Sequence, residues 1–114
     1  MFKAVWTKNA EDTFRQLEKA ALAARKNRQG KKAKSSKQEG LFKQIYKTIQ
    51  MLEQNPRHPG LNTHEYTSLR HPYDQNQKVF EAYAQHKTPS AYRVFWCYGP
   101  HHRQTTIIAI TSHP

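Results

Sequence analysis

Ala91-Tyr92-Arg93-Val94-Phe95-Trp96-Cys97-Tyr98 is the most aromatic of four strand-like runs in the second half of the chain. The other runs cover residues 64–69, 79–85 and 104–110, and residues typical of turns separate all four. Gly99-Pro100-His101-His102 predicts a turn that joins the last two runs as a hairpin. This half of the chain is therefore expected to form an antiparallel sheet.

The first half predicts one strand and two helices. Residues 2–6 alternate as a short strand does, and Asn9 can cap a helix whose apolar stripe fades around Arg25. Ser36 and Glu39 have the spacing of a capping box, and the helix that follows should end at Asn55-Pro56. The predicted order is β-α-α-β-β-β-β, an α+β fold with a two-helix hairpin packed on a mainly antiparallel sheet. We expect one domain over residues 1–114.

Charge is distributed unevenly along the chain. The formal net charge is +11, and 14 of the 19 Lys and Arg residues lie in the first 60 positions. Residues 25–37 carry seven basic residues and no acid, which predicts a basic linker between the helices. This linker is either a solvated loop or a contact for an anionic partner. The surplus of positive charge over the whole chain favours an anionic partner, of which RNA is the leading candidate.

Arg93 is the first candidate site residue, because a cation is unusual in a strand with so many aromatic neighbours. A guanidinium on a rigid strand can hold a phosphate with two donors. The alternative is a structural ion pair with Glu81 or Glu65.

Histidines supply the second set of candidates, since six of the seven lie from His64 onward. His113 directly follows the last strand, where an imidazole could act as a general acid or base, although such a position can also fray. The histidines do not have the spacing of a zinc motif, and the single cysteine, Cys97, is expected to be a small core residue. We expect no metal and no cofactor.

The aromatic residues of the strands could stack on nucleobases, but in a chain of this size most of them are expected to fill the core. No nucleophile elbow and no glycine-rich phosphate loop are present, which argues against hydrolase and nucleotide-fold classes. The longest apolar runs are too short for a membrane span, which needs roughly 20 residues. We expect a soluble, cytoplasmic protein.

Several stretches together resemble the RelE/ParE superfamily of bacterial toxins. They are Asn55-Pro56-Arg57, His64-Glu65-Tyr66, Lys78-Val79-Phe80-Glu81-Ala82-Tyr83, Ala91-Tyr92-Arg93-Val94-Phe95-Trp96 and the closing residues 107–114. The resemblance implies a microbial RNase-like fold and a toxin that is neutralised by an antitoxin protein. It also implies an endoribonuclease that cuts messenger RNA on the ribosome, where a 2′-hydroxyl attacks the adjacent phosphate.

The resemblance also implies roles for individual residues. Arg93 would stabilise charge on the phosphate, His113 would act as acid or base, and His64 is a further candidate base. Lys78 would contact phosphate. The lysines of the linker, Lys31, Lys32 and Lys34, would contact ribosomal RNA. The competing hypotheses are a non-catalytic, gyrase-directed toxin of the ParE type and an inactive relative that only binds RNA or protein.

Overall fold

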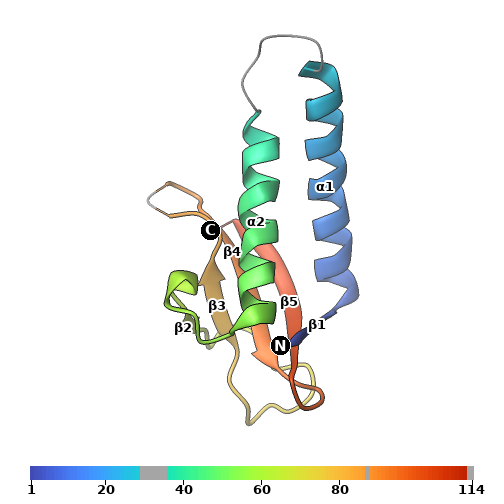
Figure 1. The fold of residues 1–114 in the computed structure, drawn as a ribbon. Coiled ribbons are helices and arrows are strands. Elements are labelled where there is room, and N and C mark those ends of the chain that lie inside the picture. Colours follow the sequence, from blue (N-terminus) through green and yellow to red (C-terminus); the bar gives the residue numbers. More distant parts are fainter. Residues whose placement is uncertain (29–35, 87, 113–114) are drawn as a thin grey trace.

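The computed structural model describes residues 1–28, 36–86 and 88–112. Its elements follow the predicted order, and a short 3-10 helix lies before the second strand (Figure 1). They are β1 (Lys3–Trp6), α1 (Lys8–Arg28), α2 (Lys37–Gln54), η1 (Pro59–Leu61), β2 (His64–Glu65), β3 (Phe80–Tyr83), β4 (Tyr92–Tyr98) and β5 (Gln104–Ser112). The predicted α+β class and element order are confirmed.

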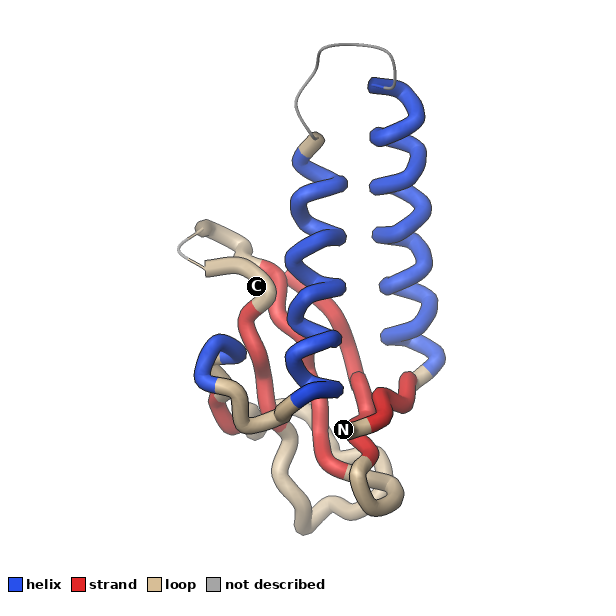
Figure 2. Tube along the Cα trace, viewed as in Figure 1, coloured by secondary structure: helices blue, strands red, loops and turns tan. Residues whose placement is uncertain are grey.

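The five strands form one mixed sheet in the order β1-β5-β4-β3-β2. All neighbouring pairs are antiparallel except β1 and β5, which run parallel. The helical hairpin connects β1 to the later strands and lies on one side of the sheet, beyond which it projects (Figures 1 and 2). The molecule is therefore elongated, with principal extents of 51 × 26 × 23 Å.

Helix α1 begins at a threonine cap and not at the predicted asparagine. The Thr7 hydroxyl accepts a hydrogen bond from the Ala10 amide at 3.1 Å, so Asn9 already lies inside the helix. The helix also continues past the predicted fading point and ends at Arg28. Residues 25–28 of the predicted linker are consequently helical, because arginine and lysine continue a helix readily even without a buried stripe.

Helix α2 begins as the sequence predicts. Ser36 and Glu39 form a reciprocal capping box, in which the Ser36 hydroxyl accepts from the Glu39 amide and the Glu39 carboxylate accepts from the Ser36 amide. The Glu39 carboxylate also pairs with Arg28 at 2.8 Å, which links the two helices. This ion pair therefore holds the last residue of α1 against the first turn of α2.

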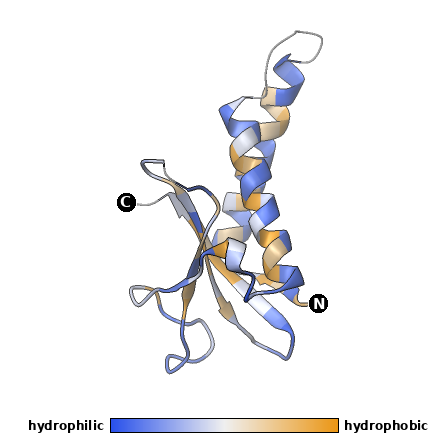
Figure 3. Cartoon of the chain, turned by 60° about the vertical axis from the view of Figure 1, so that its left-hand side comes forward, coloured by the Kyte–Doolittle hydropathy of each residue, from blue (hydrophilic) through white to orange (hydrophobic). Residues whose placement is uncertain are grey.

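The core lies between the helical hairpin and the face of the sheet that the helices cover, which we call the first face. Figure 3 shows these two layers side by side, helices against strands. Ile45, Ile49 and Leu52 of α2 pack against the central strands, where Val94 and Trp96 are almost completely buried. Within the described residues, no helix is long and apolar enough to span a membrane.

The second face of the sheet, which points away from the helices, is partly covered by residues 66–78. The ring of Tyr66 lies 4.7 Å from that of Phe95, and the Tyr73 hydroxyl bonds to Thr106 at 2.9 Å. The predicted strand over residues 64–69 was therefore too long. Only His64 and Glu65 pair with β3, because the chain then leaves the sheet edge and folds back across this face.

Candidate functional site

Arg93 lies on the second face of the sheet and is buried. Its side chain is 6% exposed, and it forms an ion pair and hydrogen bond with Glu81, whose side chain is 9% exposed. Of the two alternatives raised by the sequence, Glu81 is thus the partner of Arg93, and Glu65 is not. The pair connects β3 to β4 in the middle of the sheet.

The strand register explains why these two side chains meet. Arg93 lies opposite Tyr83, and Glu81 lies opposite Phe95, so the ion pair runs diagonally across one face. The guanidinium carbon lies 5.5 Å from the centre of the Tyr83 ring and 6.0 Å from that of Phe95. These aromatic faces attract the cation and hold it in one place.

The ion pair does not use every donor of Arg93. A guanidinium carries five N–H donors, and among the described residues the buried Nε of Arg93 has no hydrogen-bond partner. A buried donor without a partner is costly. An anion could reach this enclosed donor only after neighbouring side chains moved, so the closed arrangement by itself fits a structural ion pair.

His64 completes a row across three strands. It lies directly opposite Glu81 in the pairing of β2 with β3, it is exposed, and its ring lies 5.9 Å from that of Tyr83. The structure therefore brings two predicted site residues, His64 and Arg93, to one face and places Glu81 and Tyr83 between them. We call His64, Glu81, Tyr83 and Arg93 the second-face cluster.

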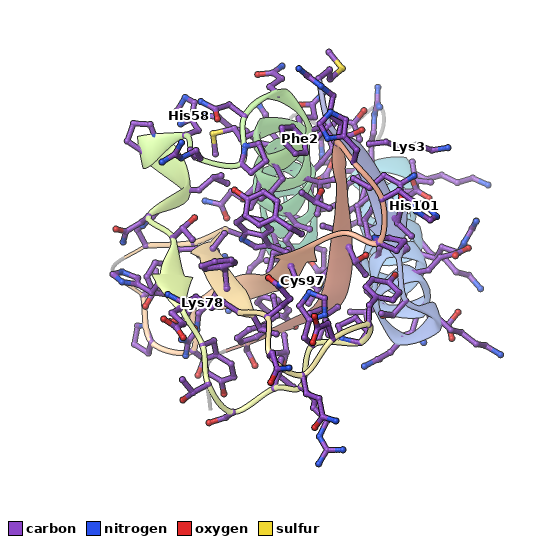
Figure 4. The ribbon with its side chains drawn as sticks, turned by 90° about the horizontal axis from the view of Figure 1, so that it is seen from below. Phe2, Lys3, His58, Lys78, Cys97 and His101 are labelled. Carbon is purple, nitrogen blue, oxygen red and sulfur yellow. The ribbon has the colours of Figure 1, made fainter. Side chains whose placement is uncertain are left out.

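The other predicted residues do not join this cluster. Lys78 is exposed, and its ammonium lies 3.5 Å from the carboxylate of Glu65. His58 and Lys78 lie towards the edge of the sheet that β2 forms, and Lys3 and His101 lie towards the other edge (Figure 4). Lys31, Lys32, Lys34 and His113 lie outside the described residues.

Sequence reasoning did not assign Glu81 and Tyr83 to the site. It treated Glu81 as a structural partner for Arg93 and Tyr83 as a packing residue. The sequence did indicate that these two residues lie together, since residues 81 and 83 are two positions apart on a predicted strand and therefore share a face. Their partners could be known only from the register between strands.

Thiol chemistry does not suit this face. Cys97 is fully buried, and burial raises the pKa of its thiol to about 11. Hydrogen bonds with Thr106 lower this pKa, but their effect is smaller than that of burial. Among the described residues, no three His, Cys, Asp or Glu side chains gather closely enough to hold a metal ion. Within the second-face cluster, His64 and Glu81 carry groups that can exchange protons, and Arg93 carries a group that can stabilise negative charge.

The fold of this chain is also found in solved structures of bacterial toxins. The structure is similar to a YoeB/ParE toxin from Agrobacterium tumefaciens, with a TM-score of 0.59 and 11% identity over 98% of this chain and 99% of that one. It is also similar to a copper-bound mutant toxin from Helicobacter pylori, with a TM-score of 0.51 and 13% identity over 99% of this chain and 96% of that one. No protein-family model and no curated protein matches the sequence.

Proposed function

We propose that this chain is a RelE-like toxin that acts in the cytoplasm as an endoribonuclease, cuts messenger RNA on the ribosome and is held inactive by an antitoxin protein. The observation that carries the proposal is the alignment of His64, Glu81 and Arg93 on one face of three consecutive strands. A base, an acid and a cation are what cleavage by a neighbouring 2′-hydroxyl requires. The toxin fold supports the same class of function.

In the proposed reaction, the 2′-oxygen forms a bond to phosphorus while the bond from phosphorus to the 5′-oxygen breaks. His64 takes the proton of the 2′-hydroxyl, and His113 gives a proton to the departing 5′-oxygen. Arg93 stabilises the negative charge that develops on the phosphate. The products are a 2′,3′-cyclic phosphate and a free 5′-hydroxyl.

The basic hairpin supports an RNA-rich target such as the ribosome. Arg25, Lys26 and Lys37 are exposed near the end of the hairpin that projects beyond the sheet, next to the linker that carries Lys31, Lys32 and Lys34. In this proposal, these cations and Lys78 neutralise phosphates without reading sequence, so binding should weaken steeply as salt rises.

A second candidate function is favoured by the burial of the ion pair. A guanidinium and a carboxylate that are both more than nine-tenths buried also fit a purely structural role. In that case the chain would be a non-catalytic toxin, directed at gyrase as in the ParE type, or an inactive relative that binds RNA or protein.

Growth arrest on induced expression distinguishes the two candidates, with cleavage of messages mapped by primer extension. His64→Ala is the first variant, because this side chain is exposed and its loss should not unfold the sheet; His113→Ala is the second. His101→Ala, an exposed histidine on the β4–β5 turn, is the matched control. The catalytic proposal expects arrest with cleavage in the wild type and the control, and loss of both in the variants. Arrest without cleavage would overturn it in favour of a binding target.

A further inference from the structure

An open cavity of about 470 Å³ lies on the first face of the sheet, beside the end of α2. It is separate from the second-face cluster, because Trp96 and Phe80 line it and these two residues pack with the helices. Its volume lies within the usual range for small-ligand sites.

Three aromatic rings form one wall of this cavity. Phe80 and Trp96 lie opposite each other on β3 and β4 with ring centres 5.0 Å apart, and Tyr98 lies 5.0 Å from Trp96. Tyr98, the last residue of β4, is 41% exposed. Among the described residues, the buried indole N–H of Trp96 has no hydrogen-bond partner. The Tyr98 ring is nearly perpendicular to the rings of Trp96 and Phe80, at 76° and 81°, so the exposed Tyr98 ring is the face of this wall on which a planar ligand can stack.

The loop between α2 and β2 forms the opposite wall. It contributes Arg57 and His58, followed by Asn62 and Thr63. The loop is held in shape from within, since the Asn55 side chain accepts from the Arg57 amide at 3.0 Å and His58 Nδ1 accepts from the Gly60 amide at 2.8 Å. None of the described residues that line the cavity carries a carboxylate. The wall is cationic and polar, and it is already formed.

We infer that this cavity binds one nucleotide of a single-stranded RNA. The base would stack on the exposed ring of Tyr98, beside the edges of Phe80 and Trp96. The phosphate would pair with Arg57, whose planar guanidinium suits phosphate oxygens. A carboxylate-free, cationic rim beside an aromatic wall fits this ligand better than an apolar or a basic peptide.

The position of the cavity relates this site to the proposed function, on which the inference rests for its choice of RNA. Thr63 lines the cavity, and the next residue, His64, belongs to the second-face cluster. Both sites thus meet at the edge formed by β2. A single-stranded RNA that passes over this edge would be held by the cavity on one side of the sheet and would reach the second-face cluster on the other side.

The test uses Trp96 as a reporter. The chain has two tryptophans, so Trp6→Phe leaves Trp96 as the only one. The probe is a single-stranded RNA hexamer with 2′-O-methyl riboses, which the proposed chemistry cannot cut because the attacking hydroxyl is blocked. We expect the hexamer to quench Trp96 fluorescence, and Tyr98→Ala or Arg57→Ala to weaken binding about tenfold, the order found when a stacking platform is lost.

Matched variants control for non-specific effects. Tyr46→Ala removes a tyrosine of similar exposure on α2, at 49%, and Arg103→Ala removes an exposed arginine from the β4–β5 turn. Both should bind the hexamer as the parent does. Arg57 is exposed, so its substitution tests the inference even if Tyr98→Ala unfolds the protein, which circular dichroism would reveal.

The outcomes separate this inference from the proposed function. Binding that is lost in Tyr98→Ala and Arg57→Ala supports the cavity even if the wild type cuts no message, in which case only the catalytic proposal fails. Absence of quenching, or equal affinities in all variants, overturns the inference even if cleavage is observed.

Discussion

Glu81 and Arg93 form a buried ion pair that crosses from β3 to β4 on the face of the sheet opposite the helices. Removing two charges from water costs several kcal/mol, and their mutual attraction often does no more than offset this cost. Two apolar side chains would hold these strands together as well. The contribution of the pair to stability and any role in function can therefore be measured separately by substitution.

A double substitution separates the structural contribution of this pair from its proposed chemistry. Glu81→Leu or Arg93→Met alone leaves an unpaired buried charge, so each should lower the free energy of unfolding by about 3–5 kcal/mol. The double variant leaves no charge behind and should recover most of this loss. Urea unfolding followed by circular dichroism measures the three values.

The same double variant then tests the role of Arg93 in toxicity. A stable double variant that no longer arrests growth fits a catalytic arginine. A stable double variant that arrests growth as the wild type does would contradict the catalytic role and leave the pair a structural one.

The ion pair between the helices predicts a specific dependence on pH. Hydrogen bonds from Arg28 and from the Ser36 amide lower the pKa of Glu39 from 4.5 to about 2. Because the folded state holds this carboxyl ionised more strongly than the unfolded state does, its contribution to stability is complete above about pH 5 and is lost as the pH falls towards 2. Glu39→Gln should therefore be less stable than the wild type at pH 7 and equal to it near pH 2.

Glu11→Gln provides the control for this experiment. Glu11 also pairs with an arginine, Arg15, but both side chains are largely exposed, and such pairs contribute little. Urea unfolding at a series of pH values should show almost no difference between this variant and the wild type. A constant difference between Glu39→Gln and the wild type down to pH 2 would contradict the account of the capping box.

Cys97 should be inert in the folded protein. Since burial raises its thiol pKa to about 11, almost no thiolate is present at pH 8, and the sulfur is also out of reach of reagents. We expect Ellman's reagent to modify the thiol only after unfolding in urea. Rapid modification of the native protein would show that residues 66–78 open readily and expose this face.

His71 should anchor the segment that covers the second face. Its Nδ1 accepts from the amides of Tyr73 and Asp74, and its Nε2 lies 3.1 Å from the Tyr98 carbonyl, so the neutral ring with its proton on Nε2 satisfies all three groups. His71→Ala leaves these groups unpaired and should cost about 1–3 kcal/mol. Hydrogen exchange should accelerate at the Tyr73 and Asp74 amides, whereas His101→Ala should leave it unchanged.

Local sequence was sufficient for the order of the elements and for the start of α2. The capping box at Ser36 and the stop at Asn55-Pro56 depend only on neighbours in the chain, so both were predictable. The start of α1 was not, because Thr7 and Asn9 are both good caps and the strand that precedes the helix decides between them: the Thr7 hydroxyl also donates to the Ile108 carbonyl of β5.

Contacts between distant residues were beyond the reach of the sequence. Arg93 and His64 could be selected as unusual residues, but the row they form with Glu81 depends on the register of β2, β3 and β4. The shortness of β2 had the same origin, since the hydrogen bonds of His71 and the packing of Tyr66 on Phe95 draw the chain away from the edge. Propensity alone favoured a longer strand.

The most direct test of the central claim is an analysis of the fragment ends produced when the purified protein is added to ribosomes that translate a defined message. The account predicts cuts that leave a 2′,3′-cyclic phosphate on one fragment and a 5′-hydroxyl on the other, with no cuts by the His64→Ala variant. Fragments that carry a 3′-hydroxyl and a 5′-phosphate, or an intact message beside arrested growth, would contradict it.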